Sequence, residues 1–473
     1  MTARWKVGLG PAACALVAAV ASWMGLSSEQ GLTLAAAAWM LVWWISEAVP
    51  IAVTSLLPIV LFPALGLMGV GEATASFGSH YVFLFLGGFL IALALEKWNL
   101  HERLALWVLL RAGNSRRRLV GGFMVATALL SMWISNTATA LMMLPIALSV
   151  ISQVPSEEGD RFPLALLLGT AYAANIGGFT TLVGTPPNVA MAGIYFDQSG
   201  SEVPFFAWML FAFPLGVVLL LAVHWLLTRW LIPVAPGAIG TSGTWFREQL
   251  ARLGAIAQAE RRVGWVFGLT ALLWMLRRPL NDGLGLNLDD TGIAMAGGLA
   301  LFVVRSERGG GARLLEWKDT QRLPWDILLL FGGGLTLARA LGNAGLIEAL
   351  AQGLAGAGTW PWWAVAAVLT ALGLLLTEVM SNLALTVVFV PVVIELAESL
   401  GLPPLLFAVP LTLASSCAFM LPMATPPNAI VFGSGKVRIR DMARVGMWLN
   451  GLAILLIVAL SWLALRPWME AFC

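Results

Sequence analysis

The sequence predicts an all-α polytopic membrane protein with about eleven transmembrane helices, two re-entrant hairpins and two inverted-topology repeats. Three observations predict it. First, 59% of the 473 residues are hydrophobic and only 11% are charged, against roughly 25% charged in a soluble domain. Second, polar breaks inside apolar segments occur twice with matched spacing. Third, two apolar runs have a length that suits a hairpin better than a crossing.

The composition also excludes several classes of protein. The net charge is +2, and we find no basic stripe with interleaved aromatic residues, so no nucleic-acid partner is expected. The cysteines Cys14, Cys417 and Cys473 are far apart and predict neither a disulfide framework nor a zinc site. With so few charges to cover its surface, the chain is expected to use the lipid bilayer as its solvent.

A membrane span needs about 20 apolar residues, and eleven segments satisfy this rule. Arg4 and Lys6 precede the first segment, which is longer than the apolar region of a typical signal peptide and is therefore predicted to be a membrane helix. The spans lie near residues 7–25, 31–46, 50–69, 79–96, 163–194 (broken), 205–232, 263–277, 290–305, 325–342, 402–433 (broken) and 445–465.

Two further apolar runs, 120–151 and 362–394, remain. A single helix of that length would measure about 50 Å, too long for a hydrocarbon core of about 30 Å. Two full crossings would need about 40 residues plus a turn. Each arm can therefore reach only the middle of the membrane and return, which predicts re-entrant hairpins with Ser-Asn at their tips. Backbone at that depth must be buried in protein or line a cavity.

Loop charges predict the orientation of the chain. The Lys/Arg-rich connections are 97–118, 229–262, 305–322 and 436–444. All four fall on the cytoplasmic side if Met1 is cytoplasmic and eleven spans follow. The first hairpin then enters from the cytoplasm and the second from outside, so the repeats are inverted. We predict a multi-pass plasma-membrane protein, of a bacterial inner membrane, with an amphipathic cytoplasmic arm at 233–262.

The repeats are marked by two kinds of motif. Ser135-Asn136-Thr137 and Ser381-Asn382-Leu383 are 246 residues apart, and Thr-Pro-Pro-Asn follows each of them, at 185–188 and 425–428. Glycine-rich segments at 84–88 and 330–334 have the same offset and are expected to allow close helix packing. Paired breaks of this kind indicate a transporter whose site lies where the two repeats meet.

The residue types at the breaks suit ion binding. Ser, Asn and Thr favour helix N-caps, and Pro suits the first turn of a helix while stopping the preceding one. Helices should therefore start after Asn136, Thr185, Asn382 and Thr425. Helix N-termini favour an anion, and the carbonyl groups exposed at breaks favour a small cation such as Na⁺. No Lys or Arg lies within 162–228 or 340–435, so coupling to a cation is expected.

These paired motifs resemble the divalent anion/sodium symporter family, also called the INDY-type or DASS transporters. The resemblance covers nearly the whole chain. It implies a symporter that moves a divalent anion, such as a C4-dicarboxylate, with Na⁺ as co-transported cargo. It further implies a homodimer in which transport domains (119–262 and 361–473) move like an elevator against scaffold helices (1–118 and 263–360).

The resemblance also assigns residues to sites. The first Na⁺ site would use Ser131, Ser135, Asn136 and Gly184, and the second Thr377, Met380, Asn382 and Ala424. The anion would contact Asn136, Thr137, Thr185, Pro186, Ser381, Asn382, Leu383, Thr425 and Pro426. Leu383 departs from family members that have Thr there, so one hydroxyl is lost and the identity of the anion stays open.

Several alternatives remain. Glu378 could couple transport to protons, as intramembrane carboxylates are functional by default, or it could brace the second hairpin. The chain could be an exchanger, a sulfate or citrate carrier, an arsenite-type permease or a channel. An intramembrane enzyme would need a nucleophile–base pair or a metal cluster, and none stands near the Ser-Asn tips, so no enzymatic activity is expected. Glu47, Glu96, Asp326 and Arg339 are expected at the membrane interfaces.

Overall fold

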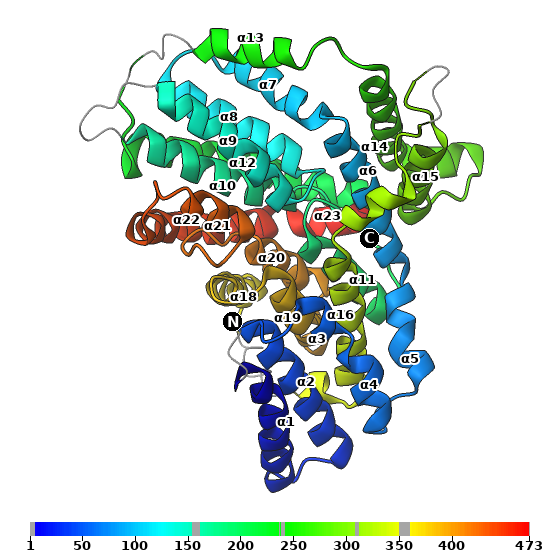
Figure 1. Cartoon of the computed structure of the whole chain (residues 1–473). Helices are drawn as coiled ribbons and strands as arrows, with labels where there is room; N and C mark the ends of the chain where they lie inside the picture. Colours follow the sequence, from blue (N-terminus) through cyan, green and yellow to red (C-terminus); the bar gives the residue numbers. More distant parts are fainter. Residues whose placement is uncertain are drawn as a thin grey trace.

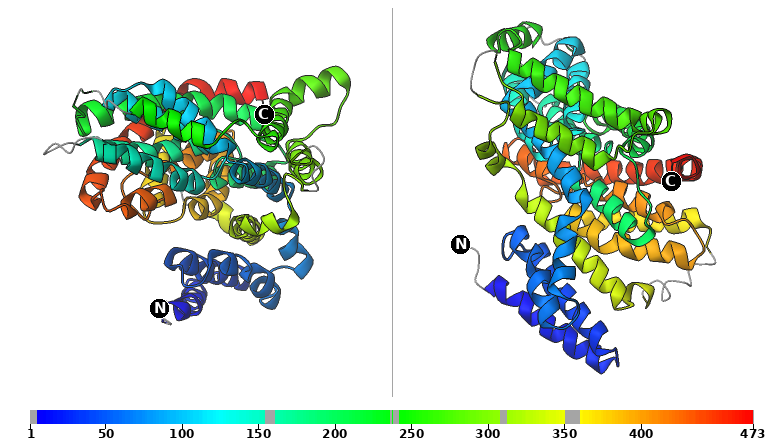
Figure 2. Two further views of the ribbon diagram at one scale, coloured as in Figure 1. Left: turned by 45° about the horizontal axis from the view of Figure 1, so that its top comes forward. Right: turned by 90° about the vertical axis from the view of Figure 1, so that its right-hand side faces the viewer.

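A computed structural model describes residues 5–153, 161–235, 237, 242–307, 312–349 and 360–472. Within these ranges the chain is almost entirely helical, as Figure 1 and Figure 2 show, and it contains one isolated bridge between Arg305 and Arg313. Met1, for which we predicted a side of the membrane, lies outside the described residues.

The N-terminal helices α1 (Trp5–Trp23) and α2 (Ser28–Ser46) pack against each other at one end of the molecule (Figure 1). Ser27 caps α2, accepting a hydrogen bond from the Gln30 backbone while the Gln30 side chain accepts one from the Ser27 backbone. The α2 helix also contacts α3, α4 and α16, so this pair is joined to the rest of the fold mainly through α2.

The predicted span at 50–69 contains a break at Leu56. The chain forms two short helices there, α3 (Ile51–Ser55) and α4 (Leu57–Ala64), because Pro58 occupies the first turn of α4 and lacks the N–H that a continuous helix requires. The segments α5 (Val70–Ala75) and η1 (Ser76–Gly78) then lead into α6 (His80–Lys97). The connection predicted at 97–118 contains a further helix, α7 (Leu100–Ala112).

Two sets of five helices follow the same order. The first set is α8 (Arg116–Ser131), α9 (Asn136–Gln153), α10 (Phe162–Phe179), α11 (Pro186–Ser199) and α12 (Phe205–Leu226). The second is α18 (Trp362–Thr377), α19 (Asn382–Ser399), α20 (Leu405–Ser415), α21 (Pro426–Gly433) and α22 (Ile439–Leu460). Each set is a helical hairpin, a broken helix and a long helix, and the predicted Ser-Asn tips lie at the two hairpin turns.

The segments between and after these sets complete the fold. They are η2 (Leu227–Leu231), α13 (Ser242–Arg252), α14 (Gln258–Leu284), α15 (Asp290–Val303), η3 (Trp317–Arg322), α16 (Trp325–Asn343), η5 (Ser461–Leu465) and α23 (Arg466–Phe472). The helix α13 forms within the predicted amphipathic arm. Its connection to α14 is held by Arg103, which pairs with Glu260 and donates to the carbonyl groups of Leu253 and Gly254.

The two repeats pack against each other through reciprocal pairs of helices. The half-helix α11 of the first set packs on α19 of the second, and α21 packs on α9. Similarly, α6 packs on α15 while α16 packs on α3. The repeated glycines make the last two contacts possible, since a Cβ on Gly87 would collide with the Ala294 backbone and one on Gly333 with the Ser55 backbone. Such reciprocal contacts are expected of two copies related by a two-fold axis.

The described residues include eight helices that are long and apolar enough to cross a membrane by length and composition. Two of them, α9 and α19, are the returning arms of the hairpins. Some of the other predicted spans correspond to shorter apolar helices, such as 51–64 and 290–303. The predicted spans at 31–46 and 263–277 lie in the long helices α2 and α14, which are not among the eight. The predicted number of eleven crossings therefore stays a prediction, whereas the many-helix membrane fold is observed.

Arg277 is the last residue of the predicted span 263–277, and its positive charge is paired in the structure. Its guanidinium lies 2.8 Å from Glu202 and 3.1 Å from Asp290, and it also donates to the carbonyl of Leu288. Because two carboxylates accompany this cation, it does not act as an unpaired positive charge in setting the orientation of the chain.

Candidate functional site

The two broken helices restart with the same geometry. Thr185 and Thr425 are the N-caps of α11 and α21, with φ/ψ of −142°/142° and −141°/150°. Two prolines follow each threonine, so the first turn begins where no N–H is needed. The restart of each half-helix is therefore determined by the local Thr-Pro-Pro sequence and is repeated in both halves.

The asparagine of each Thr-Pro-Pro-Asn motif supports the break that precedes it. Asn188 Nδ2 donates to the carbonyl oxygens of Phe179 (3.1 Å) and Thr181 (2.7 Å). Asn428 Nδ2 makes the equivalent bonds in the second repeat; its acceptors are the carbonyls of Ala418 and Leu421, both at 3.1 Å. Both asparagines are fully buried, so they replace backbone hydrogen bonds that the interrupted helices cannot make.

The hairpin tips are built in the same way in both repeats. Ser131 Oγ donates to Asn136 Oδ1 at 2.7 Å, and Thr377 Oγ1 donates to Asn382 Oδ1 at 2.7 Å. Ser131 and Thr377 are fully buried at the ends of the incoming arms. Each hydroxyl therefore orients the amide that begins the returning arm.

The first tip meets the first broken helix in an oxygen-rich cradle. Thr181 Oγ1 donates to the Met132 carbonyl at 2.5 Å and accepts from the Gly184 N–H at 3.1 Å. A Cβ on Gly178 would collide with the amide of Asn136, and one on Gly184 with the Gly178 carbonyl. Hydroxyl, amide and carbonyl oxygens thus converge where the first Na⁺ site was predicted.

The second tip meets the second broken helix through a carboxylate. Glu378 is buried, and its Oε1 accepts from the backbone N–H groups of Phe419 and Met420, both at 2.9 Å. Its Oε2 accepts from the Leu421 N–H at 3.0 Å, and Asn450 Nδ2 donates to Oε1 at 2.7 Å. Four donors therefore surround this carboxylate, as expected if Glu378 holds the second hairpin against the broken helix.

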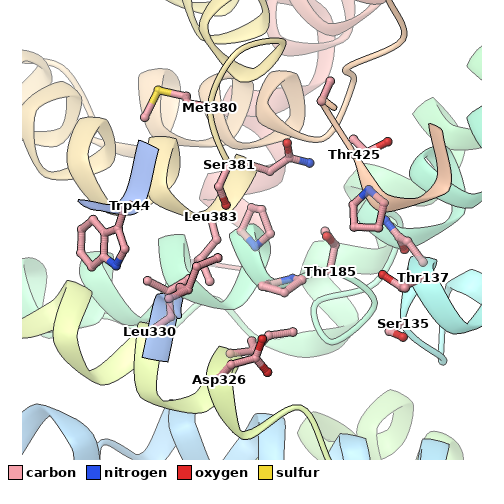
Figure 3. A pocket seen from close by; sticks show the side chains of 18 of the residues that line it. Trp44, Ser135, Thr137, Thr185, Asp326, Leu330, Met380, Ser381, Leu383 and Thr425 are labelled. Atoms are coloured by element: carbon pink, nitrogen blue, oxygen red, sulfur yellow. The ribbon is translucent and has the colours of Figure 1, made fainter. Parts of the chain in front are cut away.

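One cavity of about 620 Å³ lies between the two tips and the two half-helix starts. In Figure 3, Ser135 and Thr137 approach it from one side and Ser381 and Leu383 from the other, while Thr185 and Thr425 lie at the helix breaks. All nine residues predicted to contact the anion line it: Asn136, Thr137, Thr185, Pro186, Ser381, Asn382, Leu383, Thr425 and Pro426.

The residues predicted for Na⁺ divide into two groups. Six contribute to the cavity lining: Ser135, Asn136, Gly184, Met380, Asn382 and Ala424. Ser131 and Thr377 lie behind it, where each is hydrogen-bonded to the asparagine of its own tip. The predicted ligands are therefore close together in space, in two clusters related by the repeat.

The lining also contains residues that the motifs did not identify. Trp44, Phe89 and Leu330 add an apolar wall. The exposed carboxylates of Glu47 and Asp326 line the cavity as well, and their predicted position at the membrane interfaces stays a prediction. Their position follows from the packing of α2 and α16 and has no local sequence signal. Among the described lining residues there is no Lys or Arg.

Asn175 is a further lining residue outside the motifs. It is buried in α10, and its Nδ2 lies 3.1 Å from Thr425 Oγ1 of the other repeat. A sequence signal did exist, because an asparagine within an otherwise apolar membrane segment is costly unless it has a partner.

The two tips differ in their surroundings. Trp133 at the first tip stacks on Phe205 and on Trp274, with ring centroids 6.0 and 6.5 Å apart. Val379, the equivalent residue of the second tip, is 63% exposed and lines the cavity. The first tip is therefore packed against α12 and α14, while the second borders open space.

An apolar helical chain whose repeated hairpins and broken helices meet at one cavity, with polar groups at both hairpin tips, is typical of a membrane transport protein. The chain belongs to the family described as the sodium:sulfate symporter transmembrane region, which matches residues 2–468. It is 38% identical over 458 residues to a protein of Staphylococcus saprophyticus named sodium-dependent dicarboxylate transporter SdcS, covering 93% of this chain and 87% of that protein. The SdcS protein of Staphylococcus aureus strain MW2 is 38% identical over 441 residues, covering 90% and 84%.

Two solved structures share the fold. Neisseria gonorrhoeae MtrF, described as illuminating a class of antimetabolite efflux pumps, matches with a TM-score of 0.59 at 12% identity, covering 83% of each chain. The Alcanivorax borkumensis YdaH transporter matches with a TM-score of 0.53 at 17% identity, covering 83% of this chain and 86% of that one. The relatives bear the names of transporters, and the chain is a multi-pass membrane protein.

Proposed function

We propose that this chain is a secondary active symporter that moves a divalent anion, such as succinate, malate or fumarate, together with Na⁺. The observation that carries the proposal is the convergence of both Ser-Asn tips and both Thr-Pro-Pro starts on one cavity, whose described lining contains no Lys or Arg. The names of the SdcS relatives support the choice of a dicarboxylate and of sodium.

The electrostatics of the cavity favour a co-bound cation. Each helix N-terminus carries about half a positive elementary charge. The four starts together carry a charge of about +2, which is similar in size and opposite in sign to the charge of a dicarboxylate. The carboxylates of Glu47 and Asp326 oppose this attraction. Co-bound Na⁺ supplies the positive charge that no lysine or arginine provides, which makes anion binding dependent on sodium.

Each hairpin tip provides one sodium site in this proposal. Ser131, Ser135, Asn136 and Gly184 hold the first ion, and Thr377, Met380, Asn382 and Ala424 the second. The hydroxyl–amide pairs that are repeated at 2.7 Å support equivalent sites in the two halves. The anion then lies between the tips, in contact with the nine lining residues named above.

The rival coupling to protons through Glu378 is less favoured. Its carboxylate already accepts hydrogen bonds from three backbone N–H groups and one amide. Protonation would replace an acceptor by a donor that faces other donors, so the geometry suits a permanently ionised brace. Exchange, and transport of sulfate or citrate, are the remaining alternatives within the family.

We further propose an elevator mechanism in a homodimer. Residues 119–262 and 361–473 form the moving transport domain, and residues 1–118 and 263–360 form the scaffold. The charges of the loops predict that the C-terminal end of α2 and the start of α16 lie on the cytoplasmic side. The cavity beside Glu47 and Asp326 then faces the cytoplasm. The packed first tip and the exposed second tip are consistent with one end state of an alternating-access cycle.

Uptake of radiolabelled succinate into proteoliposomes tests the function. An imposed inward Na⁺ gradient is expected to drive accumulation, and replacement of Na⁺ by choline to abolish it. Uptake that is unchanged in choline would contradict sodium coupling, and strict dependence on internal dicarboxylate would favour exchange. Parallel assays with sulfate and citrate determine the class of anion.

A further inference from the structure

We infer that Asn175 is a positioning residue for the substrate, because it commits the hydroxyl proton of Thr425 to the bound anion. This inference rests on the proposed anion site. Asn175 belongs to α10 of the first repeat, whereas Thr425 caps α21 of the second. Their side chains meet at 3.1 Å at the edge of the cavity, and both residues are buried.

The neighbouring carbonyl determines which way the Asn175 amide points. Asn175 Nδ2 lies 3.4 Å from the carbonyl oxygen of Ala418, and a carbonyl can only accept hydrogen bonds. The NH₂ group of the amide must therefore face Ala418. The same nitrogen is the atom that faces Thr425 Oγ1, so at this contact the amide donates and the hydroxyl accepts.

Thr425 Oγ1 has a second donor as well. The backbone N–H of Asn428 donates to it at 3.4 Å, as in an ordinary N-cap. A threonine hydroxyl has two acceptor lone pairs and one proton. Both lone pairs of the Thr425 hydroxyl are therefore in use, and only its O–H donor remains. Among the described residues no acceptor receives this O–H group. An anion in the cavity supplies the missing acceptor.

The first repeat lacks this arrangement. Thr185 occupies the equivalent N-cap, but within the described residues its hydroxyl makes no capping hydrogen bond. The residue at the position equivalent to Asn175, ten residues before the threonine, is Ser415, which donates instead to the Thr412 carbonyl. The two ends of the cavity therefore differ: a carboxylate group at the Thr425 end meets a committed donor, whereas Thr185 can donate or accept.

A double-mutant cycle on the full-length protein tests the inference, with the dissociation constant of succinate measured at saturating Na⁺. Thr425→Val is expected to weaken succinate binding about tenfold, the loss typical of a hydrogen bond to a charged group. Asn175→Ala keeps this hydroxyl but no longer directs its proton, so a smaller loss of about threefold is expected. The double variant should also lose about tenfold. Thr185→Val is the matched control, and its combination with Asn175→Ala should multiply the two losses.

A second readout separates positioning from general damage to the fold. The Na⁺ concentration that half-maximally stabilises the protein against heat, without substrate, should be unchanged in Asn175→Ala. Asn175→Ser, which keeps a small donor, should recover part of the succinate affinity. Wild-type affinity in Asn175→Ala, multiplicative losses with Thr425→Val, or an equal loss of Na⁺ affinity would overturn the inference. A wild-type protein that binds no divalent anion would instead refute the proposed function.

Discussion

The carboxylate of Glu378 accepts a 2.7 Å hydrogen bond from the side-chain amide of Asn450, 72 residues away in the chain. The same carboxylate receives the N–H groups of residues 419–421. One side chain therefore joins the second hairpin tip, the break between α20 and α21, and the long helix α22. Close packing reinforces this junction, because a Cβ on Gly446 would collide with the backbone at Phe419.

Removal of this carboxylate is expected to destabilise the protein. Glu378→Ala leaves one buried and two part-buried backbone N–H groups without their acceptor, and a buried unsatisfied donor costs about 1–3 kcal/mol. Glu378→Gln places an NH₂ group against at least one N–H donor and should also lower the melting temperature. Glu398→Gln, at an exposed position on α19, is the control and should melt like the wild type. A stable Glu378→Gln protein that has lost only its response to a pH gradient would instead favour proton coupling.

The hydroxyl–amide pairs at the tips predict that substitutions of the hydroxyl residues change the sodium dependence of uptake to different degrees. Ser131→Ala and Thr377→Val each remove a hydroxyl that orients an asparagine. A hydrogen bond contributes about 1 kcal/mol net, so the Na⁺ concentration for half-maximal uptake should rise about fivefold or more. Thr377→Ser keeps the hydroxyl and should retain near-normal sodium dependence. Equal sodium dependence in all three variants would argue against the assigned sites.

The glycines of the first cradle should not tolerate a methyl group. Gly178→Ala directs a Cβ at the Asn136 amide, and Gly184→Ala directs one at the Gly178 carbonyl. Both variants should lose sodium-dependent succinate binding. Gly433→Ala in α21 is the control, since a Cβ there meets nothing within 4 Å. If the cradle variants bind succinate as Gly433→Ala does, the first tip does not form the site.

The Arg103–Glu260 pair is expected to contribute to stability rather than to transport. Both side chains are nearly inaccessible, with Arg103 Nε and Glu260 Oε2 2.8 Å apart. Loss of one partner of a buried pair costs about 3–5 kcal/mol, so Glu260→Gln should melt at a clearly lower temperature. Asp197→Asn breaks the more exposed pair with Arg339, where about 0–1 kcal/mol is expected. The transport rate per folded molecule should be normal in both variants.

Accessibility of the second tip tests the proposed orientation. In a protein with Cys14, Cys417 and Cys473 replaced, Val379→Cys should react with a membrane-impermeant thiol reagent applied from the cytoplasmic side. Succinate with Na⁺ should slow the reaction, because Val379 lines the cavity. Trp133→Cys, on the tip that packs against α12 and α14, should react more slowly. Labelling of Val379→Cys from the external side alone would reverse the proposed orientation.

Local sequence was sufficient to predict the elements that form the cavity. A threonine followed directly by two prolines favours a helix start, so Thr185 and Thr425 could be assigned as helix starts before any contact was known. Run length alone predicted turns at Ser135 and Ser381. The same reasoning missed the break at Leu56 within the predicted span 50–69, although Pro58 lies in the first turn of the second short helix.

The contacts between distant segments needed the tertiary structure. Three contacts depend on how separate helices cross. They are the contact of Glu378 with the 419–421 backbone, that of Asn175 with Thr425, and the position of Glu47 and Asp326 beside the cavity. Hydropathy and capping are properties of neighbouring residues, and they carry no information about those crossings. The sequence of the chain therefore predicts where its helices break. The packing of α2, α10, α16 and α22 determines which side chains surround those breaks.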